Sequence, residues 1–263
     1  MNESAPGTLI TGASGGIGYE LAKLCARDHR NLVLVARNGT RLAQVADELQ
    51  RQFSVSVKTV ALDLAALSAP QLLFDQLERE GIRVDILINN AGYGRFGEFA
   101  GVPLEESLGQ IQLNVTALTH LTQLFLGPML ERRSGKIMNV ASTAGFQPGP
   151  LMAVYYATKA YVISLSEALA NELAGKGITV TCLCPGATET GFAGRAGNNE
   201  SRLFKKLRPM DAKTVARAGY RGLLKGKTLV IPGLRNWLVA ESVRVSPRKL
   251  ATAISRWVSE KAE

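Results

Sequence analysis

The fold is set near the start of the chain by the stretch Thr8-Leu9-Ile10-Thr11-Gly12-Ala13-Ser14-Gly15-Gly16-Ile17-Gly18. Its first four residues predict a short strand, the glycines predict a tight loop, and an amphipathic helix follows to about Arg30. Such a loop lets a pyrophosphate approach the helix N-terminus, with its free N–H groups and partial positive charge. The stretch predicts a dinucleotide site in an α/β fold, and an ordinary strand-to-helix turn is the alternative interpretation.

Six more apolar segments predict strands that alternate with helices. They are residues 31–36, 55–62, 84–89, 137–140, 178–184 and 228–231. The longest helices are expected at residues 103–132 and 151–174. A chain of 263 residues with 46% hydrophobic content can bury a large parallel sheet in one domain. We therefore expect a doubly wound α/β fold with about seven parallel strands, forming a single domain over residues 1–263.

Side chains suited to proton transfer follow the fifth expected strand. Ser142 ends that strand, residues 148–150 break the chain, and the next helix places Tyr155 and Lys159 one turn apart on one face. A tyrosine phenol titrates near pH ~10, and the Lys159 ammonium should lower the pKa of Tyr155 by attracting its phenolate. The Ser142 hydroxyl can hold the oxygen of a carbonyl or an alcohol. These three residues predict acid-base catalysis.

Four motifs in this order resemble the short-chain dehydrogenase/reductase superfamily. They are Thr11-Gly12-x-x-x-Gly16-Ile17-Gly18, Asn89-Asn90-Ala91-Gly92, Ser142, and Tyr155-x-x-x-Lys159 thirteen residues after Ser142. The resemblance runs from about Thr8 to Thr190. It implies hydride transfer between a nicotinamide and a carbonyl carbon, with Tyr155 as acid or base and Lys159 also on the nicotinamide ribose. It further implies that Asn114, set between Leu113 and Val115, completes a relay through water.

The end of the second strand bears on the choice of cofactor. In such folds an acidic residue there holds the ribose 2′-hydroxyl of NAD, whereas a cation accommodates the 2′-phosphate of NADP. Ala36 and Arg37 supply no acid and one cation, so we expect NADP(H), and a solvated surface arginine is the alternative interpretation. The resemblance adds Asp63 near the adenine, Asn90 near its ribose, and a proline-glycine turn with a following threonine near the nicotinamide. The expected cofactor residues are Gly12, Ser14, Gly16, Ile17, Gly18, Arg37, Asp63, Leu64, Asn90, Lys159, Pro185, Gly186, Thr188 and Thr190.

The cysteines and histidines indicate neither a disulfide framework nor a metal site. Cys25, Cys182 and Cys184 are too few for either, and neither histidine has a second ligand near it in sequence. Cys182 and Cys184 should point to the same face of a strand as small buried thiols. The longest apolar runs are far shorter than the ~20 residues of a spanning helix, and residues 1–7 have no leader-like pattern. We expect a cytoplasmic protein without a bound metal.

Basic charge is concentrated in the last part of the chain. Residues 191–263 hold 16 Lys and Arg against 5 Asp and Glu, whereas residues 1–190 hold 15 against 17. Residues 191–210 lack clear periodicity and predict a mobile substrate lid. Residues 232–263 predict a basic tail that ends in an amphipathic helix. One stripe of that helix holds Leu250, Ala253, Ile254, Trp257 and Val258.

The stripe and the charge around it leave several partners open. The stripe either docks on the protein's own core or on a sister subunit, or the basic end meets an anionic membrane or the phosphates of an acyl carrier. Nucleic acid is not expected, because no aromatic residues interleave with the basic ones.

These observations together predict an NADP(H)-dependent oxidoreductase that acts on a small-molecule carbonyl or alcohol as a homodimer or homotetramer. The sequences Asn89-Asn-Ala-Gly-Tyr-Gly94 and Phe146-x-Pro-x-Pro150 resemble those of reductases of hydrophobic carbonyl compounds, including steroid and 3-oxoacyl substrates. An NADP-sensing protein without turnover and a structural oligomer are the alternatives, and the four filled catalytic positions favour the enzyme. The sequence leaves open the natural substrate, the stereochemistry and the physiological direction.

Overall fold

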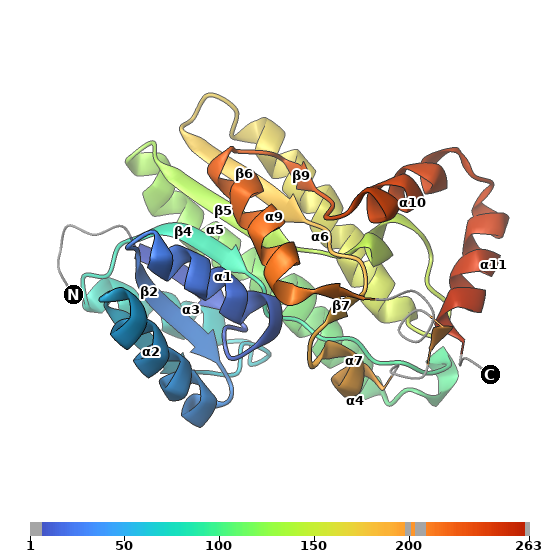
Figure 1. The fold of residues 1–263 in the computed structure, drawn as a ribbon, viewed down its shortest axis with the longest axis horizontal. Helices are drawn as coiled ribbons and strands as arrows, with labels where there is room; N and C mark the ends of the chain where they lie inside the picture. Colours follow the sequence, from blue (N-terminus) through green and yellow to red (C-terminus); the bar gives the residue numbers. More distant parts are fainter. Residues whose placement is uncertain (1–6, 198–200, 203–208, 261–263) are drawn as a thin grey trace.

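The computed structural model describes residues 7–197, 201–202 and 209–260. Its central element is a seven-stranded sheet in the order β3-β2-β1-β4-β5-β6-β9, with every neighbouring pair parallel (Figure 1). This confirms the predicted doubly wound fold and its seven strands. The strands are β1 (Gly7–Thr11), β2 (Asn31–Ala36), β3 (Val57–Ala61), β4 (Val84–Asn89), β5 (Gly135–Val140), β6 (Ile178–Leu183) and β9 (Leu229–Val230).

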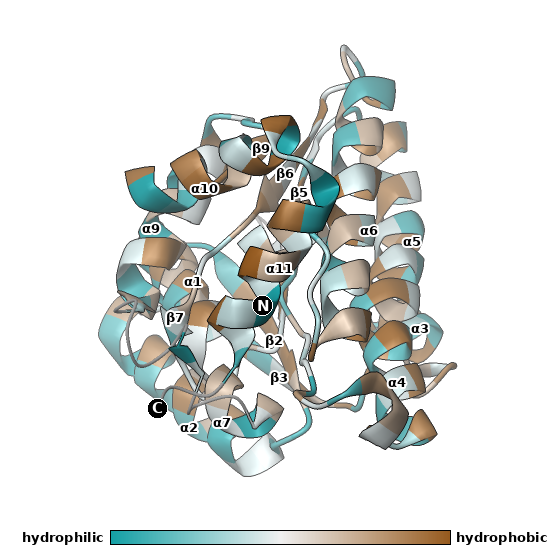
Figure 2. Cartoon of the chain, turned by 90° about the vertical axis from the view of Figure 1, so that its right-hand side faces the viewer, coloured by the Kyte–Doolittle hydropathy of each residue, from teal (hydrophilic) through white to brown (hydrophobic). Residues whose placement is uncertain are grey.

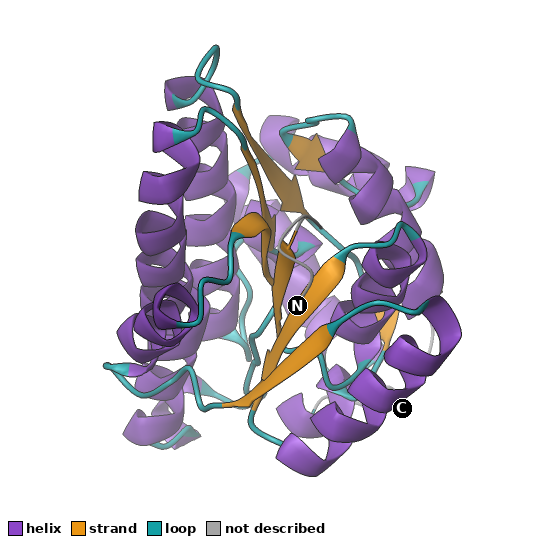
Figure 3. Ribbon diagram, turned by 90° about the vertical axis from the view of Figure 1, so that its left-hand side faces the viewer, coloured by secondary structure: helices purple, strands orange, loops and turns teal. Residues whose placement is uncertain are grey.

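Two layers of helices enclose the sheet (Figure 2, Figure 3). Successive strand residues point to opposite layers: Ile10 and Leu34 pack with one apolar cluster, Leu9 and Val33 with the other. The first layer contains α1 (Gly16–Arg27), α2 (Gly39–Phe53) and α9 (Ala212–Leu224). The second contains α3 (Ala69–Arg79), α5 (Leu118–Glu131) and α6 (Ala153–Glu172), with α4 (Leu104–Ile111) leading into α5.

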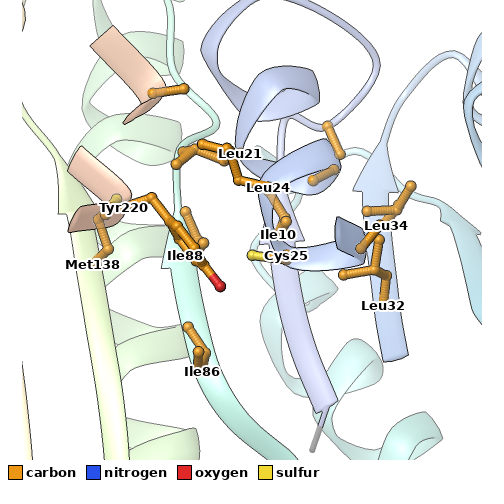
Figure 4. Close-up of a cluster of buried hydrophobic side chains, with 14 of the residues drawn as sticks. Ile10, Leu21, Leu24, Cys25, Leu32, Leu34, Ile86, Ile88, Met138 and Tyr220 are labelled. Carbon is orange, nitrogen blue, oxygen red and sulfur yellow. The ribbon is translucent and has the colours of Figure 1, made fainter. Parts of the chain in front are cut away.

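The cluster beneath α1 and α9 consists mainly of aliphatic side chains (Figure 4). Leu21 and Cys25 of α1 meet Ile10 of β1 and Ile88 of β4, and all four are fully buried. Tyr220 of α9 packs into the same cluster. Since each buried large apolar side chain contributes about 1.5–3 kcal/mol, this cluster holds the glycine loop firmly between β1 and α1.

The middle of the sheet is the point where the chain reverses its direction of winding. From β1 it proceeds outward through β2 and β3, and then it returns to pair β4 on the other side of β1. In open α/β sheets such a switch point leaves a crevice at the carboxyl ends of the strands. The glycine loop after β1 and residues 90–92 after β4 both lie at that edge.

The long helix predicted for residues 103–132 is present, but its middle is a π-helical turn. The turn covers Gln112–Ala117 and joins α4 to α5 without a break. Wider turns of this kind are rare and often lie at functional sites. It contains Asn114, one of the expected catalytic residues.

The expected lid and tail contain more regular structure than the sequence indicated. The lid holds α7 (Phe192–Ala196), and a two-residue ladder joins β7 (Thr188–Glu189) to β8 (Met210–Asp211). Residues 198–200 and 203–208 of the lid lie outside the described residues. The tail forms α11 (Arg248–Ser259), as expected after Pro247, and also α10 (Leu234–Val245), which was not predicted. Short 3-10 turns cover Phe99–Gly101 and Thr143–Phe146.

None of the helices in the described ranges is long and apolar enough to cross a membrane. Cys182 and Cys184 are fully buried with their Sγ atoms 3.6 Å apart, so the prediction that both point to the same face is confirmed, although β6 itself ends one residue before Cys184.

Candidate active site

The glycine loop after β1 forms one end of the site. Gly12 and Gly16 have φ angles of 66° and 55°, in the left-handed region that glycine adopts without strain. A Cβ atom on Gly18 would overlap the carbonyl oxygen of Gly12, so α1 can begin this close to β1 only with glycine there. The first turn of α1 thus presents N–H groups that have no partner within the helix.

Asn90, at the end of β4, holds this loop in place. Its Nδ2 donates to the carbonyl oxygens of Thr11 and Gly12, at 2.9 and 3.2 Å. The Thr11 hydroxyl in turn accepts from the backbone N–H groups of Asn90 and Ala91, each at 2.9 Å. The side chain of Asn90 is therefore engaged by the loop that it supports, although the residue also lines the cavity described below.

The ends of β2 and β3 form the far end of the site. Ala36, Arg37 and Asn38 line it from β2, and Asp63 and Leu64 line it after β3. Arg37 is exposed at the rim, and no carboxylate follows β2 directly. Asn38 is occupied in capping α2, because its Oδ1 accepts from the Arg41 backbone N–H at 2.9 Å. This leaves Arg37 as the side chain at the end of β2 suited to a phosphate.

The three catalytic candidates meet where β5 ends and α6 begins. Lys159 donates from Nζ to the Val140 carbonyl oxygen at 2.8 Å and lies 5.7 Å from the centroid of the Tyr155 ring. The Ser142 Oγ accepts from the Ala144 backbone N–H at 3.1 Å and donates to the Pro185 carbonyl oxygen at 3.3 Å. The backbone at Gly94 packs closely against the Tyr155 ring. Only glycine allows this contact, since a Cβ at this position would lie 2.9 Å from the ring.

The protonation equilibria of Tyr155 and Lys159 differ from the prediction. Burial raises the pKa of Tyr155 above its ordinary value, a hydrogen bond with the Ser142 side chain lowers it, and the charge of Tyr156 raises it. Burial lowers the pKa of Lys159 to about 8, against smaller opposing effects of Cys182 and Cys184. The expected net lowering of the Tyr155 pKa by Lys159 is therefore wrong for this structure. For both groups, burial removes more hydration free energy from the charged form than the nearby polar groups replace, so the neutral form is favoured.

Asn114 lies directly behind these residues and is buried. Its Oδ1 accepts from the Tyr93 backbone N–H at 3.1 Å, while its Nδ2 donates to the Tyr93 carbonyl oxygen at 2.8 Å and to Thr158 Oγ1 at 3.1 Å. The Thr158 hydroxyl donates to the Tyr155 carbonyl oxygen at 2.7 Å. Asn114 thus reaches the backbone of Tyr155 through one side chain, and Gly92 packs between Asn114 and Lys159.

The loop after β6 closes the site from the other side. The Thr188 hydroxyl donates to the Gly186 carbonyl oxygen at 2.9 Å, and Thr190 Oγ1 accepts from the Phe192 backbone N–H at 3.2 Å. The Thr190 side chain packs against Gly16, where a Cβ would lie 3.0 Å from its Cγ2. The loop therefore touches the glycine loop across the cavity.

These parts enclose one cavity of about 1070 Å³, which we call the site cavity. It brings together all but two of the predicted site residues. Gly18 and Asn114 lie behind its wall. Sequence reasoning missed the apolar wall that begins beside Tyr155, although the apolar residues spaced along 234–258 could have indicated part of it. That wall includes Met152, Tyr156, Phe192, Val239, Val243, Ile254, Trp257 and Val258.

The fold and the site define a doubly wound nucleotide-binding α/β protein with a Ser-Tyr-Lys group at the carboxyl ends of its strands, between β5 and α6. The site cavity fits a dinucleotide, because its volume of about 1070 Å³ extends from Arg37 past the N-terminus of α1 to Tyr155 and Lys159.

Residues 7–201 match the family model for short chain dehydrogenases, and the chain belongs to this family of oxidoreductases. It is 33% identical over 226 residues to the ketoacyl reductase HetN of Nostoc sp. The aligned region covers 85% of this chain and 77% of that protein. A short-chain dehydrogenase from Sphingobium yanoikuyae in complex with NADPH superposes with a TM-score of 0.82 at 36% identity, covering 91% of this chain and 94% of that one. The bulky-bulky ketone specific alcohol dehydrogenase from Comamonas testosteroni superposes with a TM-score of 0.78 at 31% identity, covering 91% and 92%.

Proposed function

We propose that this protein is an NADP(H)-dependent oxidoreductase that interconverts a hydrophobic carbonyl compound and its alcohol. The observation that carries the proposal is the arrangement of Ser142, Tyr155 and Lys159 along one wall of a cavity whose far rim holds Arg37. The NADPH complex of the similar Sphingobium protein supports the same cofactor here.

The residues of the site divide the work of binding and proton transfer. Bound NADPH would supply a hydride to the carbonyl carbon, and NADP⁺ would accept one from the alcohol. The N-terminus of α1 would hold the pyrophosphate, Arg37 the 2′-phosphate, and Lys159 the nicotinamide ribose. Ser142 would hold the substrate oxygen, and Tyr155 would donate its proton to that oxygen during reduction and recover it during oxidation.

The substrate end of the cavity favours an apolar compound. Met152 and Phe192 line it beside Tyr155, and Val239, Val243 and Ile254 extend the same wall. An apolar wall with a few polar groups at one end binds a compound by burying its apolar surface and fixes the carbonyl by hydrogen bonds. The ketoacyl reductase and the bulky ketone dehydrogenase among the similar proteins support this class of substrate.

Two adjacent tyrosines allow a matched test. Tyr155→Phe should abolish NADPH oxidation with a panel of lipophilic ketones while leaving NADPH affinity within about twofold, because a phenyl ring cannot supply the proton. Tyr156→Phe should retain most of the activity, since this ring packs against Gly149 and not against Ser142.

The two variants are compared by the loss of NADPH absorbance and by NADPH titration. A Tyr156→Phe protein that is inactive beside an active Tyr155→Phe protein would overturn the assignment of the acid. A native protein that binds NADPH but oxidises it with no ketone of the panel would instead be a cofactor-binding protein without turnover.

A further inference from the structure

The helical hairpin of α10 and α11, residues 232–259, presents large apolar side chains to solvent. Figure 2 shows hydrophobic positions, in brown, along both helices at this end of the molecule. The exposed fractions are largest at Val245 and Leu234, with 86% and 73%. Trp237, Leu238, Val239, Leu250, Ile254 and Trp257 are each between 46% and 56% exposed.

The hairpin packs on the protein through its small residues. Of α11 the buried residues are Ala251, Ser255 and Ser259, whereas Leu250, Ile254 and Trp257 of the same helix are more than half exposed. Arg202 secures the helix end by donating to Glu260 Oε2 at 3.0 Å. The alternative that this apolar stripe docks on the protein's own core is therefore wrong.

Basic residues surround the exposed apolar ones. Residues 232–259 contain five Arg or Lys and a single carboxylate, Glu241, which pairs with Arg244 at 3.3 Å. All five basic side chains are exposed: Arg235, Arg244, Arg248, Lys249 and Arg256. Both tryptophans of the chain, Trp237 and Trp257, are on this hairpin. Tryptophan and cationic side chains beside exposed aliphatic ones are the composition of surfaces that lie in a membrane interface.

We propose that the α10–α11 hairpin is a docking surface for an anionic phospholipid bilayer. The hairpin inserts its apolar side chains among the lipid headgroups, and its Arg and Lys residues pair with the lipid phosphates. The same hairpin lines the site cavity, because Val239, Ile254 and Trp257 are exposed and also belong to the cavity wall. A lipophilic substrate therefore has an apolar route from the bilayer to Tyr155, a step that rests on the proposed function.

Charge favours the bilayer over the other occupants. In a two-fold contact with a second copy the same surface would meet itself and bring the two basic sets together, which costs free energy. An acyl carrier would satisfy the basic residues, but it leaves the exposed apolar side chains of Leu234, Leu238 and Val245 without a partner. An anionic bilayer satisfies both the charge and the apolar surface.

Two double variants test the two halves of the surface. Arg248→Glu with Lys249→Glu reverses charge in the first turn of α11, where carboxylates favour the helix dipole, so the helix should persist. Val245→Asp with Leu250→Asp removes apolar side chains that do not line the cavity. The matched controls are Arg27→Glu with Arg51→Glu at the C-terminal ends of α1 and α2, and Leu67→Asp with Leu72→Asp near α3, all of which are exposed and lie away from the hairpin.

The experiment measures co-sedimentation of the full chain with vesicles of phosphatidylglycerol and phosphatidylcholine, or of phosphatidylcholine alone, at low and high salt. Tryptophan fluorescence is read on the same samples, because both fluorophores lie on the hairpin. Binding should need the anionic lipid, shift the emission to shorter wavelength and weaken at high salt. Each cation near such a surface contributes about fivefold to partitioning, so Arg248→Glu with Lys249→Glu should lose about 25-fold or more. Val245→Asp with Leu250→Asp should lose the emission shift, and both controls should bind like the native chain.

The remaining outcomes overturn the proposal. These are no binding at low salt, equal binding to both lipid mixtures, or a native dimer that Val245→Asp with Leu250→Asp converts to monomer. Capture of an acidic acyl carrier protein in place of vesicles would assign the surface to that partner.

Turnover of a water-soluble ketone without vesicles is measured in parallel. If turnover persists while vesicle binding is absent, docking fails and the proposed function stands. If vesicle binding persists but the protein turns over no ketone, the docking proposal stands and the proposed function fails.

Discussion

Lys159 is buried to 95% and has no carboxylate partner within the described residues, which is unusual for an ammonium group. Its hydrogen bond to the Val140 carbonyl offsets part of the lost hydration. The spacing of Ser142, Tyr155 and Lys159 was enough to predict that they form one group. Their pKa values could not be predicted in the same way, because the extent of burial depends on side chains from helices and loops distant in sequence.

The lowered pKa of Lys159 predicts a specific pH dependence of stability. Its folded-state pKa is about 8, below the ordinary 10.5, so the unfolded chain binds one more proton between these values. The free energy of unfolding should therefore rise with pH across that window. Below pH 8 the buried Lys159 is charged, and the full destabilisation by its lost hydration is present. The total change is on the order of 3 kcal/mol.

Lys159→Met removes this titration and provides the measurement. At pH 7 the variant should be more stable than the native chain in denaturant unfolding, and the difference should shrink as the pH approaches ~10. The native chain serves as its own reference for all other titrating groups. A difference that stays constant over this range would contradict the lowered pKa.

Arg37 predicts the preference between the two nicotinamide cofactors. A charge-assisted contact with a phosphate contributes roughly 1.5–3 kcal/mol, so NADPH should bind about ten- to a hundredfold more tightly than NADH. Ala36→Asp combined with Arg37→Ala should reverse the preference by placing a carboxylate where the ribose 2′-hydroxyl binds. Titration of both proteins with both cofactors measures the ratio, and equal affinities in the native chain would contradict it. Arg41→Ala, at an exposed position of α2, is the control.

Among the elements, the π-helical turn at Gln112–Ala117 has the clearest link to the site. The sequence predicted a continuous helix with Asn114 in its middle, and both features are present. It could not predict the wider turn, because apolar periodicity over six residues does not distinguish α from π geometry. The turn places the Asn114 amide against Tyr93 and Thr158 at the same time.

Thr158 connects this turn to α6, and its removal should affect catalysis more than cofactor binding. Thr158→Val keeps the shape but leaves the Asn114 Nδ2 and the Tyr155 carbonyl without this hydroxyl, at a cost of about 1–2 kcal/mol. The expected result is a several-fold lower kcat with an unchanged Kd for NADPH. Thr119→Val removes a more exposed hydroxyl that contacts Tyr161 and should change neither value. A parallel loss of NADPH affinity would show that the link supports the whole site and not Tyr155.

The tail shows where element prediction reached its limit. The stripe from Leu250 to Val258 correctly predicted an amphipathic helix, because spacing alone fixes which residues share a face. The spacing does not fix which face is buried, because that depends on the neighbouring elements. In the structure α11 buries its small residues Ala251, Ser255 and Ser259. The preceding α10 was missed because apolar and polar residues are spread around it without one dominant face.

At the scale of the whole molecule, the residues of the Ser-Tyr-Lys site and the excess of basic residues belong to different parts of the chain. Residues 1–190 carry every motif of the Ser-Tyr-Lys site and nearly balanced charge, and residues 191–263 carry the excess of basic side chains. Figure 1 places α10 and α11 at one end of the molecule, beyond the edge strand β9. The charge imbalance was readable from the sequence, and the resemblance to the family already implied that the basic lid and tail surround the substrate end of the site; Arg195 and Arg235 line the cavity there.

The packing of α9 against α1 has a consequence for how the chain acquires its structure during synthesis. Val215 and Leu223 complete the cluster begun by Leu21 and Ile10, and Tyr220 bonds Asp28 across 192 residues of sequence at 2.8 Å. A nascent chain that has released all strands but the last has α1 and α2 in place, but it still exposes the part of the apolar cluster that α9 covers. We therefore expect arrested chains with only residues 1–190 outside the ribosome to be protease-sensitive and bound by chaperones, and arrested chains with residues 1–225 outside it to become resistant. Pulse proteolysis of ribosome-bound intermediates measures this, and early resistance would show that the first six strands fold without their last covering helix.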